Sequence, residues 1–401
     1  MKKILLVINT LGRGGAENAL IQLIKKIDKN EYDIFLFVVL SQGELIEKIP
    51  SNVHILNENF DSSSVLSPEG KKILKKNIRK RLFKKAAIFK NLFYIISNAF
   101  TMIFKERIMA DKLLWKTLSD ASPVFDEEYD LAVAFLEGAS TYYVRDHVKA
   151  KKKAAFIHVN YSEAGYTRKL DKDAYLDFDG IYTVSEDAKE SFLSVYPECS
   201  DKTSVFENII DRETIIKKAD EKGGFEDSFD GKRILTIARL TPQKAIDVSI
   251  KACRELTDKG ENVRWYVLGD GELRDKLEAL IKECGLSERF FLLGVKDNPY
   301  TYLKQCDIYV HATKFEGKSI AIREAQVLKK PIVVSDCKSN LELVKDEEDA
   351  LVCKLDSSDI CEKILRLIYD ANLCKKISEN AGCRFIDGSE KVNELLKLIQ
   401  R

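Results

Sequence analysis

The chain has 401 residues, of which 45% are apolar, and this length exceeds what one hydrophobic core usually organises, so we expect two domains. Lys and Arg total 65 against 64 Asp and Glu, which excludes a protein wholly devoted to nucleic acid. Nine cysteines, all from Cys199 onward, form no C-x-x-C pair, and their odd number indicates free thiols in a reducing compartment.

The N-terminal stretch "MKKILLVINT" has an apolar run too short for a signal peptide, and Arg13 and Glu17 follow where a cleavage region would lie. We therefore interpret it as a first strand. No other stretch approaches the roughly 20 apolar residues that span a bilayer.

Short apolar runs alternate with amphipathic stretches along the chain, which is typical of parallel sheets covered by helices on both faces. The pattern predicts an α/β fold with two such sheets. The expected strands lie at residues 3–9, 33–40, 53–56, 131–136, 153–159 and 180–185, and then at 233–238, 263–269, 290–294, 307–312, 331–335 and 350–354.

An acidic, Gly-containing stretch after "FENIID" marks the expected domain boundary. We expect a first domain at 1–208, a second at 209–384, and a last helix within 385–401 that has Ser389 as its N-cap. Ligands of such sheets bind outside the carboxyl ends of the strands, so two domains that face each other would form a cleft.

A basic segment at residues 71–90 holds ten Lys or Arg and no acid, which leaves 55 basic against 64 acidic residues elsewhere. Ile73, Leu74, Ile78, Leu82, Ala86 and Phe89 recur at helical spacing, and the apolar "LFYIISNAFTMIF" follows. One interpretation is that residues 71–104 bind an anionic membrane surface, with Ile78, Leu82 and Phe89 inserted. The other is a solvated helix whose apolar stripe packs on its own domain.

A glycine-rich turn, "LGRGGAEN" at residues 11–18, lies between the first strand and the first helix. Gly14 and Gly15 would let backbone N–H groups approach a phosphate, although a plain tight turn explains the stretch equally well. Glu17 stands where a dinucleotide-binding G-x-G-x-x-G requires its last glycine.

Two cations, Arg239 and Lys244, follow the first strand of the second domain in "TIARLTPQKAID". A guanidinium fork and an ammonium at this position can neutralise a diphosphate. The later turns "VLGDGELRDKL" and "LLGVKDNP" could cradle a base or a ribose, or be plain loops.

The stretch "KFEGKSIAIREA", residues 314–325, places two glutamates around a Gly-Lys-Ser turn that opens into a helix. Gly317 allows close backbone approach, and the N–H groups of Lys318, Ser319 and Ile320 would face an anion. Glu324 could accept hydrogen bonds from ribose hydroxyls, and Glu316 from hydroxyls beyond the phosphates.

Two histidines complete the candidates. His158 ends a strand, where it could touch a reacting group or be structural, and we interpret His311 as a packing residue. No carboxylate cluster indicates a metal site.

Five motifs follow one another along residues 1–355, namely the Gly-Gly-Ala-Glu turn, "VSE" at 184–186, the Arg239 and Lys244 pair, "LGDGELRDKLE", and Glu316 with Glu324. With these motifs in this order, the chain resembles the retaining glycosyltransferases of family 4, which have the GT-B fold. The basic segment lies in an insertion at about 60–125 outside this pattern. Family members often have a second glycine soon after Glu-Gly, where this chain has Lys-Ser-Ile.

The resemblance implies a metal-independent enzyme that moves a sugar from a nucleotide-sugar, which we expect to be a UDP-sugar. Glu316, His158, Arg239 and Lys244 would be catalytic, with Arg239 and Lys244 on the donor diphosphate and Glu316 on the donor sugar. The substrate-binding residues would also include Gly14, Gly15, Gly317, Lys318, Ser319, Ile320 and Glu324. The last helix would return to the first domain.

The resemblance also implies a glycan or lipid-linked acceptor, used in cell-surface polysaccharide or glycolipid synthesis. With the basic segment, it predicts a cytoplasmic protein at the inner face of the membrane, without a cofactor and without a nucleic-acid partner. The alternatives are a GT-B nucleotide-sugar epimerase and a non-catalytic subunit that binds nucleotide-sugar.

Overall fold

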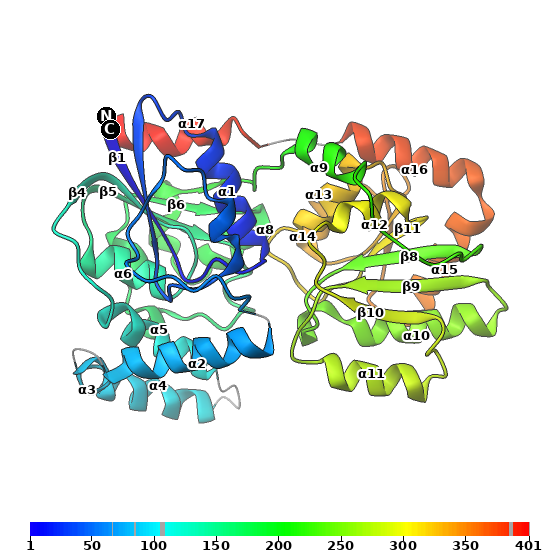
Figure 1. Cartoon of the computed structure of the whole chain (residues 1–401), viewed down its shortest axis with the longest axis horizontal. Coiled ribbons are helices and arrows are strands. Elements are labelled where there is room, and N and C mark those ends of the chain that lie inside the picture. Colours follow the sequence, from blue (N-terminus) through cyan, green and yellow to red (C-terminus); the bar gives the residue numbers. More distant parts are fainter. Residues whose placement is uncertain (66, 84–85, 105–108, 385–387, 401) are drawn as a thin grey trace. The chain divides into compact units, whose positions relative to one another are not determined.

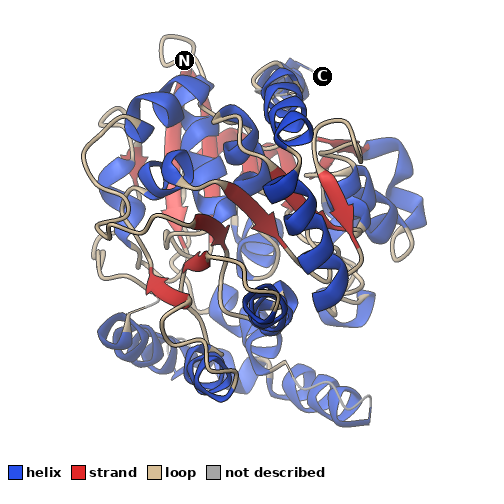
Figure 2. Ribbon diagram, turned by 90° about the vertical axis from the view of Figure 1, so that its right-hand side faces the viewer, coloured by secondary structure: helices blue, strands red, loops and turns tan. Residues whose placement is uncertain are grey.

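The computed structural model describes residues 1–65, 67–83, 86–104, 109–384 and 388–400. The chain divides into two compact units, of which the N-terminal unit comprises residues 1–209 and 388–401 and the C-terminal unit residues 210–387. In each unit a parallel sheet is covered by helices (Figures 1 and 2). The prediction of a two-domain α/β fold with parallel sheets is confirmed.

The N-terminal unit contains a seven-stranded sheet in the order β3-β2-β1-β4-β5-β6-β7. Its strands are β1 (Lys2–Ile8), β2 (Tyr32–Val38), β3 (His54–Ile55), β4 (Glu128–Ala134), β5 (Lys149–Ile157), β6 (Gly180–Thr183) and β7 (Thr203–Val205). Ile4 to Ile8 of β1 are fully buried because β1 is central and helices cover both faces of the sheet.

The helices of this unit are α1 (Gly15–Lys26), α2 (Pro68–Phe83), α3 (Ala87–Lys90), α4 (Leu92–Phe104), α5 (Ala110–Asp120), α6 (Ala139–His147), α7 (Arg168–Asp171), α8 (Glu186–Leu193) and α17 (Lys391–Leu396). Short 3₁₀ helices are η1 (Glu44–Lys48), η3 (Ala174–Asp177), η4 (Pro197–Lys202) and η6 (Lys397–Gln400). The segment between β3 and β4, where the insertion is predicted, forms α2 to α5 at one edge of the unit (Figure 1).

The C-terminal unit contains a six-stranded sheet in the order β10-β9-β8-β11-β12-β13. Its strands are β8 (Lys232–Ile237), β9 (Val263–Leu268), β10 (Phe290–Gly294), β11 (Ile308–His311), β12 (Ile332–Ser335) and β13 (Leu351–Cys353). Its helices are α9 (Arg212–Ala219), η5 (Pro242–Lys244), α10 (Ile246–Asp258), α11 (Arg274–Glu283), α12 (Pro299–Gln305), α13 (Ile320–Val327), α14 (Lys338–Leu341), α15 (Ser357–Tyr369) and α16 (Ala371–Cys383).

The largest fully buried side chain of the C-terminal unit is Trp265 on β9. Its indole Nε1 donates a hydrogen bond to Thr236 Oγ1 on β8 at 3.1 Å, so the polar edge of the ring is satisfied inside the core. Aliphatic residues of α10 and α15 pack around it. This packing holds β8 and β9 together, and the loops that follow these strands belong to the candidate site.

The last helix packs within the N-terminal unit. Leu398 lies against Gly180 of β6, and the Tyr182 hydroxyl donates to the Glu394 carbonyl at 3.5 Å. The predicted Ser389 cap is wrong, because α17 starts after Glu390, which makes no side-chain cap bond. Residues 385–387, where we expected this tail to begin, lie outside the described residues.

Candidate functional site

The loop after β8 carries Arg239 and Lys244 and is built against the turn that follows β9. A Cβ on Gly269, whose φ is +142°, would lie 2.0 Å from the Ala238 carbonyl oxygen, and one on Gly271 would lie 2.4 Å from that of Leu240. Only glycine permits this approach of two backbones. The "LGDGE" turn therefore supports the cationic loop.

Arg239 is exposed and makes no ion pair with any described residue, so its guanidinium is available to an anion from solution. Lys244 is different, because its side chain is only 10% exposed and its ammonium pairs with Glu316, which is 16% exposed. Of the two cations predicted to act together, Arg239 has no ion pair among the described residues, and Lys244 is already paired with Glu316.

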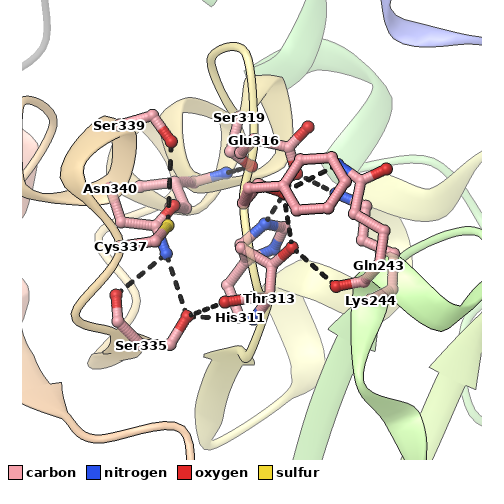
Figure 3. A network of polar contacts seen from close by, with 12 residues as sticks. Gln243, Lys244, His311, Thr313, Glu316, Ser319, Ser335, Cys337, Ser339 and Asn340 are labelled. Carbon is pink, nitrogen blue, oxygen red and sulfur yellow. Dashed lines mark hydrogen bonds and ion pairs between the residues drawn. The ribbon is translucent and has the colours of Figure 1, made fainter. Parts of the chain in front are cut away.

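Glu316 also lies near His311, whose Nε2 is 3.5 Å from the same carboxylate oxygen that meets Lys244 (Figure 3). Burial would raise the pKa of Glu316, but the Lys244 ammonium and the His311 ring hold it well below its ordinary value. Burial lowers the pKa of His311, so its ring is neutral near pH 7. His311 is therefore part of this polar cluster rather than only a packing residue.

Backbone and side-chain hydrogen bonds fix the loop that presents Glu316. Gln243 Nε2 donates to the Phe315 carbonyl at 2.7 Å, and the Lys314 N–H donates to the Gln243 carbonyl at 2.9 Å. The Thr313 hydroxyl has the carbonyls of Gln243 and Phe315 within hydrogen-bond distance, at 3.1 and 3.0 Å, and can donate its proton to either, while Ser335 Oγ accepts from the Thr313 N–H (Figure 3). Lys244 and Glu316 are consequently held by one network.

The Gly-Lys-Ser turn leads into α13. Ser319 is its N-cap and its Oγ accepts from the Ile322 N–H at 3.3 Å, so Ile320 is the first helical residue. Gly317 is buried, and Lys318 Nζ lies 3.8 Å from Glu342 Oε2. The first N–H groups of α13 have no intrahelical acceptor, as in any α-helix, and follow directly after Glu316.

Glu324 lies on α13 and accepts a hydrogen bond from the Tyr300 hydroxyl at 2.9 Å. Burial raises the pKa of Glu324 from its ordinary value to about 7, so this carboxyl holds a proton at a higher pH than an exposed glutamate does. A carboxyl in this state can accept from or donate to a ligand hydroxyl. The sequence did not predict that Tyr300 of α12 contacts Glu324, because no motif spacing links the two residues.

In the N-terminal unit, Gly14 is the N-cap of α1 and Gly15 is its first, exposed residue. A Cβ on Gly14 would lie 2.2 Å from Glu17 Oε2, and Thr10 Oγ1 donates to Glu17 Oε1 at 3.5 Å. A carboxylate therefore already stands beside this turn. It favours hydroxyl donors over a phosphate as ligands there.

His158 follows β5 and stacks near the rings of Phe135 and Phe156. Its backbone N–H and that of Val159, at 3.1 Å, donate to Glu137 Oε1. Burial lowers the pKa of His158 to about 4 and raises that of Glu137 to about 7. Glu137 was missed in the sequence, where a single acid after a strand has no distinguishing pattern.

Asp120, Asp146 and His147 of the N-terminal unit offer three potential metal-ligand atoms within 4.8 Å of one another. Lys116 Nζ lies 2.6 Å from Asp120 Oδ1 and 3.1 Å from Asp146 Oδ2. An ammonium therefore fills the place that a cation would take, and the cluster is a structural ion network.

Comparison with known proteins matches residues 218–382 to the family described as glycosyl transferases group 1. These residues include Arg239, Lys244, Glu316 and Glu324.

Among the relatives, the chain is 33% identical over 196 residues to the N-acetylgalactosamine-N,N'-diacetylbacillosaminyl-diphospho-undecaprenol 4-alpha-N-acetylgalactosaminyltransferase of Campylobacter jejuni, covering 49% of this chain and 51% of that protein. It is 27% identical to the UDP-Gal:alpha-D-GlcNAc-diphosphoundecaprenol alpha-1,3-galactosyltransferase of Escherichia coli, covering 49% of this chain and 53% of that protein. The chain spans about half the length of the curated relatives it matches.

Among solved structures, the Anabaena protein HepE in complex with UDP-glucose superposes with a TM-score of 0.67 at 18% identity, over 99% of this chain and 100% of that one. At this identity the likeness shows the fold alone. The C-terminal unit therefore contains a glycosyl transferases group 1 domain, and the chain has the two-domain fold of GT-B glycosyltransferases.

Proposed function

We propose that the chain is a retaining glycosyltransferase of family 4 that transfers a sugar from a UDP-sugar to a glycan or lipid-linked acceptor. The observation that carries the proposal is the buried pairing of Lys244 with Glu316 directly before the N-terminus of α13. An ammonium and a carboxylate held in one loop network directly precede the N-terminal turn of α13. They can serve the phosphate and the sugar of one donor.

The donor diphosphate would bind Arg239, Lys244 and the first N–H groups after Gly317, with Lys318, Ser319 and Ile320 contributing. Arg239 has no ion pair among the described residues, so its guanidinium can join the phosphate without breaking another contact. Lys244 would be shared between the phosphate and Glu316. The sum of these charges stabilises the departing nucleoside diphosphate, without a metal ion or another cofactor.

Glu316 and Glu324 would bind different parts of the donor. Glu316, kept ionised by Lys244 and His311, accepts from donor-sugar hydroxyls near the reacting carbon. Glu324, supported by Tyr300, binds the ribose. Gly14 and Gly15, beside the Glu17 carboxylate, would meet sugar hydroxyls, and the neutral ring of His158 would contact the reacting sugar.

In the proposed step, the bond from the anomeric carbon to the diphosphate oxygen breaks, and a bond to the acceptor oxygen forms on the same face. The acceptor hydroxyl proton passes to the departing diphosphate. The electron pair of the broken bond stays on the diphosphate oxygen, where Arg239 and Lys244 neutralise it.

The acceptor class rests on the relatives. The printed names of two of them describe transfer to sugars on diphospho-undecaprenol. We infer a lipid-linked or other glycan acceptor for this chain, in cell-surface glycan synthesis on the cytoplasmic side.

The test is to incubate the protein with UDP-sugars and lipid-linked acceptors in the presence of EDTA, and to measure free UDP and the anomeric configuration of the product. We expect UDP only when acceptor is present, and a product that retains the donor configuration. UDP release together with an epimerised free sugar would favour the epimerase. Donor binding without turnover under any acceptor would favour a non-catalytic subunit.

A further inference from the structure

The helices between β3 and β4 carry an exposed apolar face that the proposed chemistry does not use. We propose that this face docks into an anionic lipid surface, with α4 lying in the plane of the interface and the cations of α2 on the lipid headgroups. We call it the α4 apolar face, and it consists of Phe89, Leu92, Phe93, Ile96, Phe100, Ile103 and Phe104. The proposal does not depend on catalysis, because lipid binding is measured separately.

Helix α4 buries Tyr94, Asn98 and Met102 on its own unit and leaves large apolar side chains exposed on its other side. Phe93 is 87% exposed and Phe104 is 73% exposed, whereas Asn98 is buried. Positions 93, 96, 100 and 103 recur at helical spacing, so their side chains share one side of the helix. A contiguous apolar patch on a solvent-exposed surface usually marks an interaction site.

Polar contacts on the opposite side hold α4 in this orientation. The Tyr94 hydroxyl donates to the Leu170 carbonyl, and the Lys172 ammonium lies 4.6 Å from the centre of the Tyr94 ring. Just before the helix, Asn91 Nδ2 donates to Asp120 Oδ2 at 2.7 Å. Turning α4 to bury its phenyl rings would break these bonds, so these contacts keep the apolar face exposed.

A row of cations lies on the neighbouring helix α2, which, like α4, packs on α5 in the same edge of the unit (Figure 1). Lys71, Lys72, Lys75, Lys76, Arg79 and Lys80 are all exposed. None of them has an acidic partner within salt-bridge distance among the described residues. Lys84 and Lys85 of the basic segment lie outside the described residues.

The apolar residues of α2 differ from those of α4. Ile78 and Leu82 are half-buried on their own unit, whereas Phe89 on α3 is 69% exposed. The surface available for insertion is therefore on α3 and α4, and α2 supplies charge. The sequence pattern assigned both roles to the basic segment.

The combination favours a lipid surface over a second copy of the chain. The exposed basic row of α2 lies in the same edge of the unit as the α4 apolar face, and anionic headgroups complement its charge, whereas a second copy of the chain would add like charge. The 13 residues of α4 reach about 20 Å, less than the roughly 30 Å of a bilayer core. A helix of this length fits in the plane of the interface. The part of the chain that the structure describes contains no helix that meets the length and apolarity of a membrane span.

The experiment is co-sedimentation of the full chain with phosphatidylcholine vesicles that contain or lack phosphatidylglycerol. Changing Phe93, Ile96 and Phe100 to Gln should weaken binding to the anionic vesicles on the order of 100-fold, because three apolar side chains no longer leave water. Changing Lys75, Lys76, Arg79 and Lys80 to Glu should weaken it at least about 100-fold.

A matched control replaces exposed apolar residues outside this face, with Leu176, Ile216 and Tyr369 changed to Gln. It should bind vesicles as the wild type does. A single Phe100→Trp variant should show fluorescence quenching by brominated lipid, and a Tyr369→Trp variant should not. Because all these side chains are exposed, circular dichroism should report an unchanged fold.

Equal sedimentation of the wild type and the Phe93, Ile96 and Phe100 variant would overturn the proposal, as would failure of the wild type to bind. A wild-type dimer that the same variant converts to a monomer, without vesicle binding, would assign the face to a second copy. If the wild type binds the vesicles but does not turn over any UDP-sugar, the proposed function is rejected and this inference stands.

Discussion

Lys244 and Glu316 share one largely buried loop network, and each neutralises the other before any ligand arrives. Removing one partner of such a pair leaves an uncompensated charge, which costs more than the pair itself contributes. A diphosphate that approaches Lys244 therefore has to compete with Glu316 or share the ammonium with it. This competition gives the two glutamates of the site distinct kinetic signatures.

Glu316→Gln should lower kcat about 100-fold, while KM for the donor stays unchanged or falls. Glutamine no longer neutralises the Lys244 ammonium, so the ground-state diphosphate binds at least as well, but the negative charge near the reacting carbon is lost. Steady-state kinetics with saturating acceptor measure both constants.

Glu324→Gln serves as the matched variant, since Gln still accepts from the Tyr300 hydroxyl. It should raise KM for the donor roughly tenfold with little change in kcat. Wild-type kinetics in both variants would remove the roles assigned to these residues.

Glu137 provides a test in the N-terminal unit. Burial raises its pKa from 4.5 to about 7, so the folded state holds a proton that the unfolded chain releases above about pH 4.5. Its contribution to the free energy of unfolding is therefore fully present below its unfolded pKa and declines as pH rises to about 7. His158, with its lowered pKa, changes stability in the opposite direction over a similar range.

Glu137→Gln should remove a decline of roughly 3 kcal/mol between about pH 5 and about pH 8, because Gln keeps the acceptor for the His158 and Val159 N–H groups without titrating. Trp115 lies against Gly138, next to this site, so its fluorescence in a Trp265→Phe background reports urea unfolding of this unit. If the free energy of unfolding depends on pH in the same way with and without the Glu137→Gln change in this background, the Glu137 carboxyl does not titrate in this pH range.

At the scale of elements, the strands follow from sequence because each is a continuous apolar run between helices. The twelve expected strands match β1 to β6 and β8 to β13. The missed strand, β7, has only three residues, "TSV", and pairs at the edge of its sheet, where no apolar run is needed. Helix α4 was visible as an apolar stretch, but its orientation depends on contacts of Tyr94 with Leu170, which are remote in sequence.

The role of the turn after β9 in supporting the loop of Arg239 and Lys244 can be tested by a Gly-to-Ala substitution, which adds one methyl group. Gly269→Ala should displace the loop that carries Arg239 and Lys244, because the new Cβ meets the Ala238 carbonyl oxygen, and should weaken UDP binding at least about tenfold. Isothermal titration measures the affinity.

Gly260→Ala is the control, since Gly260 also has a positive φ, +84°, but a Cβ there meets nothing within 4 Å. It should lose about 1 kcal/mol of stability and no affinity for UDP. Equal affinities of the two variants would show that the close approach of this turn does not shape the site.

At the scale of the whole molecule, the sequence sufficed for the two-sheet fold, because periodicity and strand-end turns are local properties. Arg239, Lys244, Glu316 and Glu324 were predicted as site residues from their positions at strand ends and a helix start, and their roles stay predictions. Tyr300, His311 and Glu137 were missed or misassigned, because their roles arise only when distant segments pack. The pairing of Lys244 with Glu316 joins segments 72 residues apart and has no signature in either one.

The most direct test of the account is titration of UDP into the protein in the presence of EDTA, for the wild type, Lys244→Ala, and Lys251→Ala as an exposed-lysine control. We predict that the wild type and Lys251→Ala bind UDP equally, and that Lys244→Ala binds at least about 30-fold more weakly, a loss of about 2 kcal/mol. Circular dichroism establishes that each variant is folded. Binding of UDP only after a divalent metal is restored, or equal binding by Lys244→Ala, would contradict the account.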